Sequence, residues 1–303
     1  MKRFSKITTT QLARICGVSQ GTVDRALHNR PGINEKTRER ILAVAREYDY
    51  VPHVKGKNAE NSMLIGVVLF DFYNEFFSKL AMRLVREAKK MGYSLIFQFS
   101  EKDLDRERTA IEYFDYIGVD GIILFSAGSD NPEYENYLRS VTKPLILIGN
   151  RLFNLPYVGI DDRQAMKDVT LRLMKNSAKK DVVYYAPILR KNLNKDNAQN
   201  LRLQGFTDAM KQRRRRFRIV TDLKDLSNAG VIVCATDYYA VSVLKHLGFP
   251  LDVKISGFDN ISMLENLNAP ILTVEYSTDE IALECLNYIL GRPYHPQIGY
   301  RLV

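Results

Sequence analysis

The sequence is poor in the residues that build disulfide frameworks and metal sites. Among its 303 residues it has three cysteines and four histidines. The cysteines, at positions 16, 234 and 285, are far apart, odd in number and without metal-ligand spacing. That is typical of reduced packing residues in a cytosolic protein. The histidines, at positions 28, 53, 246 and 295, are equally scattered. We therefore expect no metal site and no cofactor.

Long apolar runs, an export signal and common catalytic motifs are missing as well. No apolar run reaches the length that spans a membrane. The first residues, MKRFSK, lead into a polar helical segment rather than into the apolar stretch of a secretory signal. The sequence has no nucleophile elbow, no phosphate-binding glycine loop and no G-x-G-x-x-G motif after its first strand-like run. We expect a cytoplasmic protein that is neither an enzyme nor membrane-bound.

Positive charge, in contrast, is concentrated near the N-terminus. The formal net charge is +9, and residues 1–60 hold 12 Lys or Arg against 6 Asp or Glu. Two-thirds of the excess therefore lies in the first fifth of the chain. A basic segment of this kind is where contacts with nucleic-acid phosphates are expected.

Residues 7–50 have the pattern of three short helices. One of the threonines at positions 8–10 can cap the first helix, whose apolar face would be Leu12, Ala13 and Ile15. Gly17 can adopt the positive φ of a tight turn, and Ser19 can then cap a second helix. Two short helices joined by a glycine turn are typical of the helix-turn-helix that fits a DNA major groove.

The second helix combines an apolar face with a polar one. The side chains that can turn inward are Val18, Val23, Ala26 and Leu27. Those left outward are Gln20, Thr22, Asp24, Arg25 and His28. The third helix, which Asn34 can cap, has Ile41, Leu42, Ala45 and Tyr48 at helical spacing. Any small three-helix bundle can show this pattern, but the basic charge favours DNA binding.

The rest of the chain predicts an α/β body. The polar segment Pro52–Ser62 has no periodic apolar face and is interpreted as a linker. Strand-like apolar runs follow at Leu64–Phe70, Leu95–Phe99, Gly121–Phe125, Leu145–Ile148, Val182–Tyr185, Val231–Ala235 and Ile255–Phe258. Helical patterns between them include Phe77–Met91, Asp105–Ile117, Arg163–Lys175 and Leu201–Lys211. This alternation favours parallel sheets covered on both faces, and the number of strands favours two lobes.

Over nearly its whole length the chain resembles the LacI/GalR family of bacterial transcription regulators. The head carries GVSQGTVDRAL, TRERI and YDYVP. The body carries MLIGVVLFDFYNEFF, VDGIILF, GNR, VGIDDRQA, LRLQGF, CATDYYAVSVLKHLG and ISGFDN in the family's order. The resemblance implies an all-α helix-turn-helix head and a two-lobed body like the periplasmic binding proteins. It also implies a homodimer on double-stranded operator DNA, with a small effector between the lobes.

The resemblance further implies domain boundaries. The DNA-binding head would be residues 1–52, the hinge 53–62 and the effector-binding body 63–303. One lobe would comprise about 63–160 with part of 271–303, and the other about 161–270.

The family pattern assigns DNA contacts to the head and hinge. Candidate base-reading residues are Ser19, Gln20, Gly21, Thr22, Asp24 and Arg25. Arg25 can bond to a guanine or a phosphate, and Gln20 can bond to an adenine or stay solvated. Asp24 would repel phosphate unless it orients Arg25, as we expect, or accepts from a cytosine amino group. Short donors at backbone-contacting positions are Thr8, Thr22, His28, Asn34 and Thr37. In the hinge, Lys57 and Ala59 are candidates, although Gly56 and Ala59 replace the usual alanine and leucine and should weaken minor-groove insertion.

The family pattern also assigns effector contacts to the body. The candidates are Asp71, Asn74, Phe76, Phe77, Asn150, Arg151, Arg202, Thr236, Asp259 and Tyr276. Aromatic faces and planar hydrogen-bonding groups in a cleft suit a sugar or sugar derivative. Thr236 and Tyr276 depart from the family's asparagine and glutamine, and the region Arg218–Gly230 is short. A phosphorylated sugar, a non-sugar effector or reduced binding therefore stay open, and one wall of the pocket must be rebuilt or missing.

Two alternatives remain at this point. The body alone would suit a solute-binding protein without a DNA-regulatory role, although the basic head and the missing export signal argue against it. The run Arg213–Arg216 invites a second nucleic-acid interpretation, but its place after a helix in the body favours a solvated turn.

Overall fold

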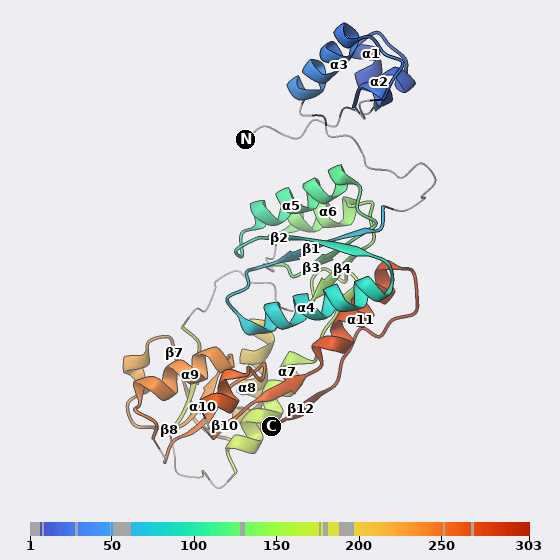
Figure 1. The fold of residues 1–303 in the computed structure, drawn as a ribbon. Coiled ribbons are helices and arrows are strands. Elements are labelled where there is room, and N and C mark those ends of the chain that lie inside the picture. Colours follow the sequence, from blue (N-terminus) through green and yellow to red (C-terminus); the bar gives the residue numbers. More distant parts are fainter. Residues whose placement is uncertain are drawn as a thin grey trace.

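The computed structural model describes residues 7, 9–27, 30–48, 50, 62–127, 131–175, 177, 181–187, 197–250, 252–267 and 270–303. Within them, three helices at the N-terminus precede a body of two α/β lobes (Figure 1). The two-lobed α/β prediction is confirmed.

The head contains α1 (Thr9–Ile15), α2 (Gln20–Leu27) and α3 (Glu35–Glu47). Its predicted turn is present, and so are the predicted caps of α2 and α3. Gly17 has a φ of +59°. The Ser19 hydroxyl accepts a hydrogen bond from the backbone of Thr22 at 3.2 Å, and the Asn34 side chain accepts one from Thr37 at 2.8 Å. These side chains satisfy amides that a helix start leaves without a partner.

A small core of its own holds the head together. Its buried members are Leu12, Ala13, Cys16, Val23, Ala26, Ile41 and Ala45. Two predicted members are wrong. Ile15 is exposed because Cys16, four residues after Leu12, takes the inward position on this face instead. Tyr48 is exposed because α3 ends at Glu47, so Tyr48 leaves the helical face.

The first lobe is built on a parallel sheet in the order β2-β1-β3-β4-β5. Its strands are β1 (Leu64–Leu69), β2 (Ser94–Phe99), β3 (Gly121–Leu124), β4 (Leu145–Ile148) and β5 (Tyr157–Val158). Its helices are α4 (Glu75–Lys90), α5 (Leu104–Ile117), α6 (Pro132–Ser140) and the late α11 (Thr278–Ile289). Helices α5 and α6 cover one face, while α4 and α11 cover the other (Figure 1). Strands buried on both faces explain the continuous apolar runs of the sequence.

The second lobe has the same architecture, with strand order β10-β9-β8-β6-β7. Its strands are β6 (Asp181–Tyr185), β7 (Arg218–Val220), β8 (Ala229–Cys234), β9 (Lys254–Ser256) and β10 (Ile271–Leu272). Helices α7 (Asp162–Leu173) and α8 (Ala198–Gln212) pack on one face, and α9 (Asp237–His246) and α10 (Met263–Leu267) on the other. The connection from β7 to β8 contains only a four-residue 3₁₀ helix, Leu223–Leu226, in place of a full helix. That connection is as short as the sequence predicts.

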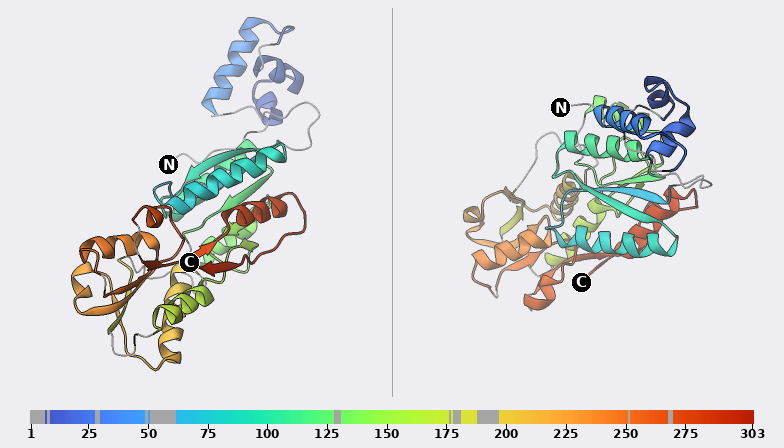
Figure 2. Two further views of the ribbon diagram at one scale, coloured as in Figure 1. Left: turned by 60° about the horizontal axis from the view of Figure 1, so that its bottom comes forward. Right: turned by 45° about the horizontal axis from the view of Figure 1, so that its top comes forward.

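The chain passes between the lobes three times, which places a hinge beside the cleft. The passages run from β5 to α7, from β11 (Val274–Tyr276) to α11, and from α11 to β12 (Tyr300–Leu302) (Figure 2). Strands β11 and β12 pair antiparallel, and Gly159 bridges to Gln297 beside them. Strand ends and helix starts of both lobes therefore meet at one region, where open α/β sheets bind ligands.

Candidate functional site

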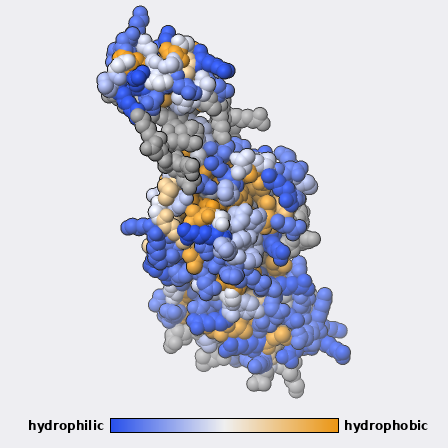
Figure 3. Space-filling model, turned by 90° about the vertical axis from the view of Figure 1, so that its right-hand side faces the viewer, coloured by the Kyte–Doolittle hydropathy of each residue, from blue (hydrophilic) through white to orange (hydrophobic). Residues whose placement is uncertain are grey.

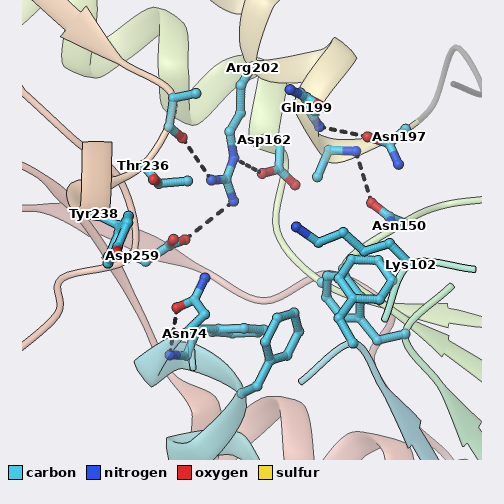
Figure 4. A pocket seen from close by; sticks show the side chains of 18 of the residues that line it. Asn74, Lys102, Asn150, Asp162, Asn197, Gln199, Arg202, Thr236, Tyr238 and Asp259 are labelled. Atoms are coloured by element: carbon cyan, nitrogen blue, oxygen red, sulfur yellow. Dashed lines mark hydrogen bonds and ion pairs between the residues drawn. The ribbon is translucent and has the colours of Figure 1, made fainter. Parts of the chain in front are cut away.

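A cavity of about 470 Å³ lies between the two lobes. The first lobe contributes the ends of β1, β3 and β4 and the start of α4, and the second contributes α7, α8, α9 and the loop after β9. Figure 4 shows polar and charged side chains of the second lobe facing aromatic rings of the first. The volume is in the range of small-molecule sites.

Arg202 is the centre of the polar wall. Its Nε donates to Asp162 at 2.8 Å, its Nη2 donates to Asp259 at 3.3 Å, and its Nη1 donates to the carbonyl oxygen of Ala235 at 3.0 Å (Figure 4). The guanidinium also stacks on Phe258, with its carbon 3.6 Å from the ring centroid. All three charged side chains are largely buried. The arginine is therefore fixed in orientation, as a binding group must be.

Close packing of two helices sets the Arg202–Asp162 pair. Asp162 is the first residue of α7, and Arg202 lies in α8. A Cβ atom at Gly205 would lie 2.1 Å from the carbonyl oxygen of Arg163, so only glycine permits this approach. Asp259 reaches the arginine from the loop after β9 with a φ of +104°, a conformation that non-glycine residues rarely adopt.

In and behind the polar wall, carboxyl groups outnumber the single guanidinium of Arg202. Burial raises the pKa of Asp162 to about 6, although Arg202 opposes the shift. Burial, followed by the charge of Asp259, raises the pKa of Asp237 to about 7. Asp237 lies behind the wall, where its carboxylate accepts from the Thr273 hydroxyl at 2.7 Å and from the backbone of Ile261 at 3.1 Å. Beside a guanidinium, a carboxylate can accept hydrogen bonds from the hydroxyl groups of a ligand, and a carboxyl group that keeps its proton can also donate one.

The opposite wall is aromatic. Phe70, Phe77 and Phe125 pack edge to face, with ring centroids 4.8 Å apart for Phe70–Phe125 and Phe77–Phe125. Phe76 adjoins Phe77 at 5.4 Å. All four line the cavity, and Phe76 and Phe77 are also buried, so they pack in the core and present ring atoms to the cavity at once. Such a surface suits the apolar face of a sugar ring.

The remaining predicted residues cap helices or form hydrogen bonds that stabilise the cavity wall. Asn74 caps α4 by accepting from Phe76 at 3.0 Å, and Thr236 caps α9. Asn150 joins the lobes: its amide donates to Ser126 at 2.6 Å and its oxygen accepts from Ala198 at 3.1 Å. The carboxylate of Asp71 accepts from the backbone of Tyr73 at 2.9 Å, and the hydroxyl of Tyr276 donates to Asp259 at 2.9 Å.

Of the predicted effector residues, Arg151 does not line the cavity. After the turn at Gly149, Asn150 is buried at the cavity while the next side chain is exposed to solvent. The residues that the sequence did not nominate include Lys102, Asp162, Asn197, Gln199 and Tyr238. Asp162 and Tyr238 lie in VGIDDRQA and CATDYYA, each just after a strand, so the position after a strand was the available signal.

The candidate base-reading residues are Ser19, at the cap of α2, and residues of α2 itself, while Thr37 lies on α3. Ser19, Gln20, Gly21 and Arg25 are exposed, and Thr22, Asp24 and Thr37 are half-buried. The Gln20 amide donates to the hydroxyl of Thr10. Asp24 forms an ion pair with Arg30 at 2.9 Å, and its expected orientation of Arg25 stays a prediction. Exposed Asn34 caps α3. Thr8, His28, Lys57 and Ala59 lie outside the described residues.

Two features are absent from the part of the chain that the structure describes, a metal-ligand cluster and a membrane-spanning helix. There, no group of three or more His, Cys, Asp or Glu side chains could hold a metal ion. No helix among the same residues is long and apolar enough to cross a membrane.

Comparison with known proteins gives matches for both parts of the chain. The family model described as "Bacterial regulatory proteins, lacI family" matches residues 9–53. The model described as "Periplasmic binding proteins and sugar binding domain of LacI family" matches residues 62–229, more than half of the chain.

Individual relatives match over nearly the full length. The ribose operon repressor of Bacillus subtilis (strain 168) is 26% identical, with 94% of this chain and 91% of that protein covered. The sucrose operon repressor of Streptococcus mutans is also 26% identical, with 94% and 92% covered. A solved structure of the lac repressor dimer bound to operator and the anti-inducer ONPF has a TM-score of 0.69 at 16% identity. It covers 99% of this chain and 98% of that chain, and the likeness is one of fold.

Proposed function

Because this chain belongs to the LacI family of bacterial regulatory proteins, we propose that it is a sequence-specific DNA-binding repressor controlled by a small effector. The effector would be a sugar or sugar derivative in the cavity between the lobes. The observation that carries this proposal is Arg202, which is held between Asp162 and Asp259 opposite a wall of phenylalanine rings. This is the pairing of polar and apolar surfaces that a sugar ring needs.

The head supplies the DNA-binding half of the function. Ser19, at the cap of α2, and Gln20 and Arg25 on α2 are exposed on a basic domain, and the backbone of α2 is fixed by the Ser19 cap and the Gly17 turn. We propose that α2 enters the major groove, where each bidentate contact contributes ~1–3 kcal/mol of discrimination. The domain boundaries 1–52, 53–62 and 63–303 belong to this proposal, with a cytoplasmic location, where operator DNA lies.

Two heads are needed for a pseudo-palindromic operator, and we propose that the first lobe forms the homodimer. Met82 is 66% exposed on α4, and Val85, one turn away, is exposed too. Phe72 and Phe99, whose ring centroids are 4.6 Å apart, are exposed beside the edge strand β2. Figure 3 shows apolar side chains gathered on one face of the lobe nearer the head. The occupant that fits is a second copy, as in the operator-bound lac repressor dimer of the same fold.

Regulation would follow from lobe closure. A ligand that touches both cavity walls favours one orientation of the lobes over another by its difference in affinity. In a dimer that change alters the separation of the two heads and so their fit to two half-sites.

The experiment measures DNA and sugar binding on the same protein. Duplexes selected from a random library are bound in a fluorescence anisotropy assay at several salt concentrations. The sugars tested are D-ribose, D-xylose, D-glucose, sucrose, cellobiose and ribose 5-phosphate. We expect submicromolar DNA binding that falls steeply with salt, and a change in affinity with at least one sugar. Sugar binding by calorimetry without any DNA binding would instead support a solute-binding protein.

A further inference from the structure

The cavity wall of the second lobe is completed by α9. No described residue of the short segment Arg218–Cys234 lines the cavity. On this side the lining includes Thr236, Tyr238 and Tyr239, which belong to the cap and first turn of α9. Two consecutive tyrosines of α9 therefore line the cavity on the second lobe, whereas the short β7–β8 connection does not.

Tyr238 is held on a rigid base, yet its side chain is in solvent. The backbone N–H of the preceding Asp237 donates to the carbonyl oxygen of Phe258 at 2.8 Å. The Asp237 carboxylate is buried and accepts hydrogen bonds from Thr273 and Ile261. Thr236 caps the helix at the same point. Even so, the Tyr238 side chain is 62% exposed, with its ring 6.3 Å from that of Tyr239. An exposed aromatic side chain on a fixed backbone beside a cavity is a typical ligand anchor.

Tyr73 has the same arrangement in the first lobe. It lines the cavity from the turn before α4 and is 97% exposed. Asp71 fixes that turn by accepting from the backbones of Tyr73 at 2.9 Å and Asn74 at 3.3 Å. Each lobe therefore presents one solvent-exposed tyrosine to the same cavity, from a turn held by a neighbouring aspartate.

We propose that Tyr73 and Tyr238 form a two-ring clamp that contacts the effector and covers the ring of a cyclic ligand when the lobes close. The clamp rests on the proposed function of the cavity. The polar wall around Arg202 would hold the hydroxyl groups of the ligand, while the two rings bury its C–H faces. The ligand class is a compound with a ring and two apolar faces, such as a cyclic sugar, rather than an extended polyol.

The first test compares ring and non-ring substitutions at position 238. Affinity for the best-binding sugar of the six named above is measured by calorimetry. Tyr238→Phe should bind within about twofold of the unsubstituted protein, whereas Tyr238→Leu should bind about tenfold more weakly. Phe249→Leu is the matched control, because Phe249 is in the same lobe, is 50% exposed and does not line the cavity. Unchanged affinity in Tyr238→Leu would overturn the clamp while leaving the proposed function intact.

A second test uses the absence of tryptophan from the sequence. Tyr238→Trp and Tyr73→Trp each introduce a single fluorophore, with Phe249→Trp as the control. On saturation with sugar, emission from positions 73 and 238 should shift to the blue, and emission from position 249 should not. Unchanged emission at 73 and 238, with binding seen by calorimetry, overturns the clamp alone. If none of the six sugars binds, the sugar effector of the proposed function fails and the clamp fails with it.

Discussion

Glu75 of the first lobe accepts hydrogen bonds from Ser262 of the second. The Ser262 backbone donates at 2.9 Å and its hydroxyl at 2.5 Å. Lys79, which pairs with Glu75 at 2.6 Å, reaches across to the carbonyl oxygen of Asn260 at 3.4 Å. Asn74, which precedes Glu75, and Asp259, which precedes Asn260, line the cavity. The contact between the lobes therefore lies directly beside the cavity.

We predict that Glu75→Ala shifts the balance between lobe orientations. Spin labels at Lys89→Cys and His246→Cys, on different lobes, would report the distance distribution by pulsed electron resonance. The variant should show a broader or displaced distribution, because bonds between the lobes are lost. Glu87→Ala is the control, since Glu87 pairs with Lys90 on the same helix at 2.6 Å. Identical distributions in Glu75→Ala and the parent would show that the contact does not hold the lobes.

Asp237 should make the body less stable as the pH rises. Burial, and then the charge of Asp259, raise its pKa to about 7, above ~3.9 in an unfolded chain. The native state therefore retains a proton that the unfolded state has lost. This contribution to stability is fully present below about pH 4 and is lost as the pH rises through about 7.

The variant Asp237→Asn isolates that contribution. Its unfolding free energy should fall less steeply between about pH 4 and pH 7, by up to ~1.4 kcal/mol per pH unit. A hydrogen bond lost in the variant would lower its unfolding free energy at every pH, but it would not change how steeply that free energy falls with pH. Urea denaturation across this pH range measures it, with exposed Asp161→Asn as the control. Parallel curves for Asp237→Asn and the parent would contradict the raised pKa.

Gly205→Ala should destabilise the body and weaken the cavity. The added methyl would meet the carbonyl oxygen of Arg163, so α7 and α8 must separate, at a cost of ~1–3 kcal/mol. That movement also separates Asp162 from Arg202. Thermal unfolding and sugar titration measure both effects. Gly299→Ala, where a methyl would meet nothing within 4 Å, should behave like the parent. Equal melting temperatures for the two variants would refute the packing argument.

Much of the fold could be predicted because its strands and helices have strong local patterns. All seven strand-like runs correspond to strands, from β1 to β9. The strands that the sequence pattern does not predict, Tyr157–Val158 and Ile271–Leu272 among them, are two or three residues long and carry no periodicity. Their pairing depends on neighbours that are distant in sequence.

The site was predictable only in part, because its geometry is not local. Arg202 and Asp259 follow from recognisable segments, but the pairing of Arg202 with Asp162 depends on a helix contact that Gly205 permits. Asn150 lines the cavity and its neighbour Arg151 does not, because successive side chains after a strand point in different directions. Asp24 lies six residues from its partner Arg30, beyond the reach of a helical-spacing argument.

Arg25→Ala should relax sequence preference more than it weakens overall DNA binding. If Arg25 bonds to a guanine, its loss removes ~1–3 kcal/mol of discrimination at one base pair. Sequencing of duplexes recovered from a random library measures this for Arg25→Ala and for Arg46→Ala, an exposed arginine on α3. A phosphate contact would instead leave the preference unchanged and lower affinity for all sequences.

In the proposed function, the cavity between the lobes controls the DNA-binding head. Arg202→Lys tests it most directly, because lysine keeps the buried charge but cannot reproduce the guanidinium's simultaneous contacts with Asp162, Asp259 and Ala235. Arg163→Ala, on exposed α7 surface outside the cavity, is the control. Operator affinity is measured by anisotropy with and without the sugar to which the parent responds. We predict that Arg202→Lys binds operator within about twofold of the parent but loses at least about tenfold in sensitivity to the sugar. An undiminished sugar response in Arg202→Lys would show that the cavity around Arg202 does not control the DNA-binding head.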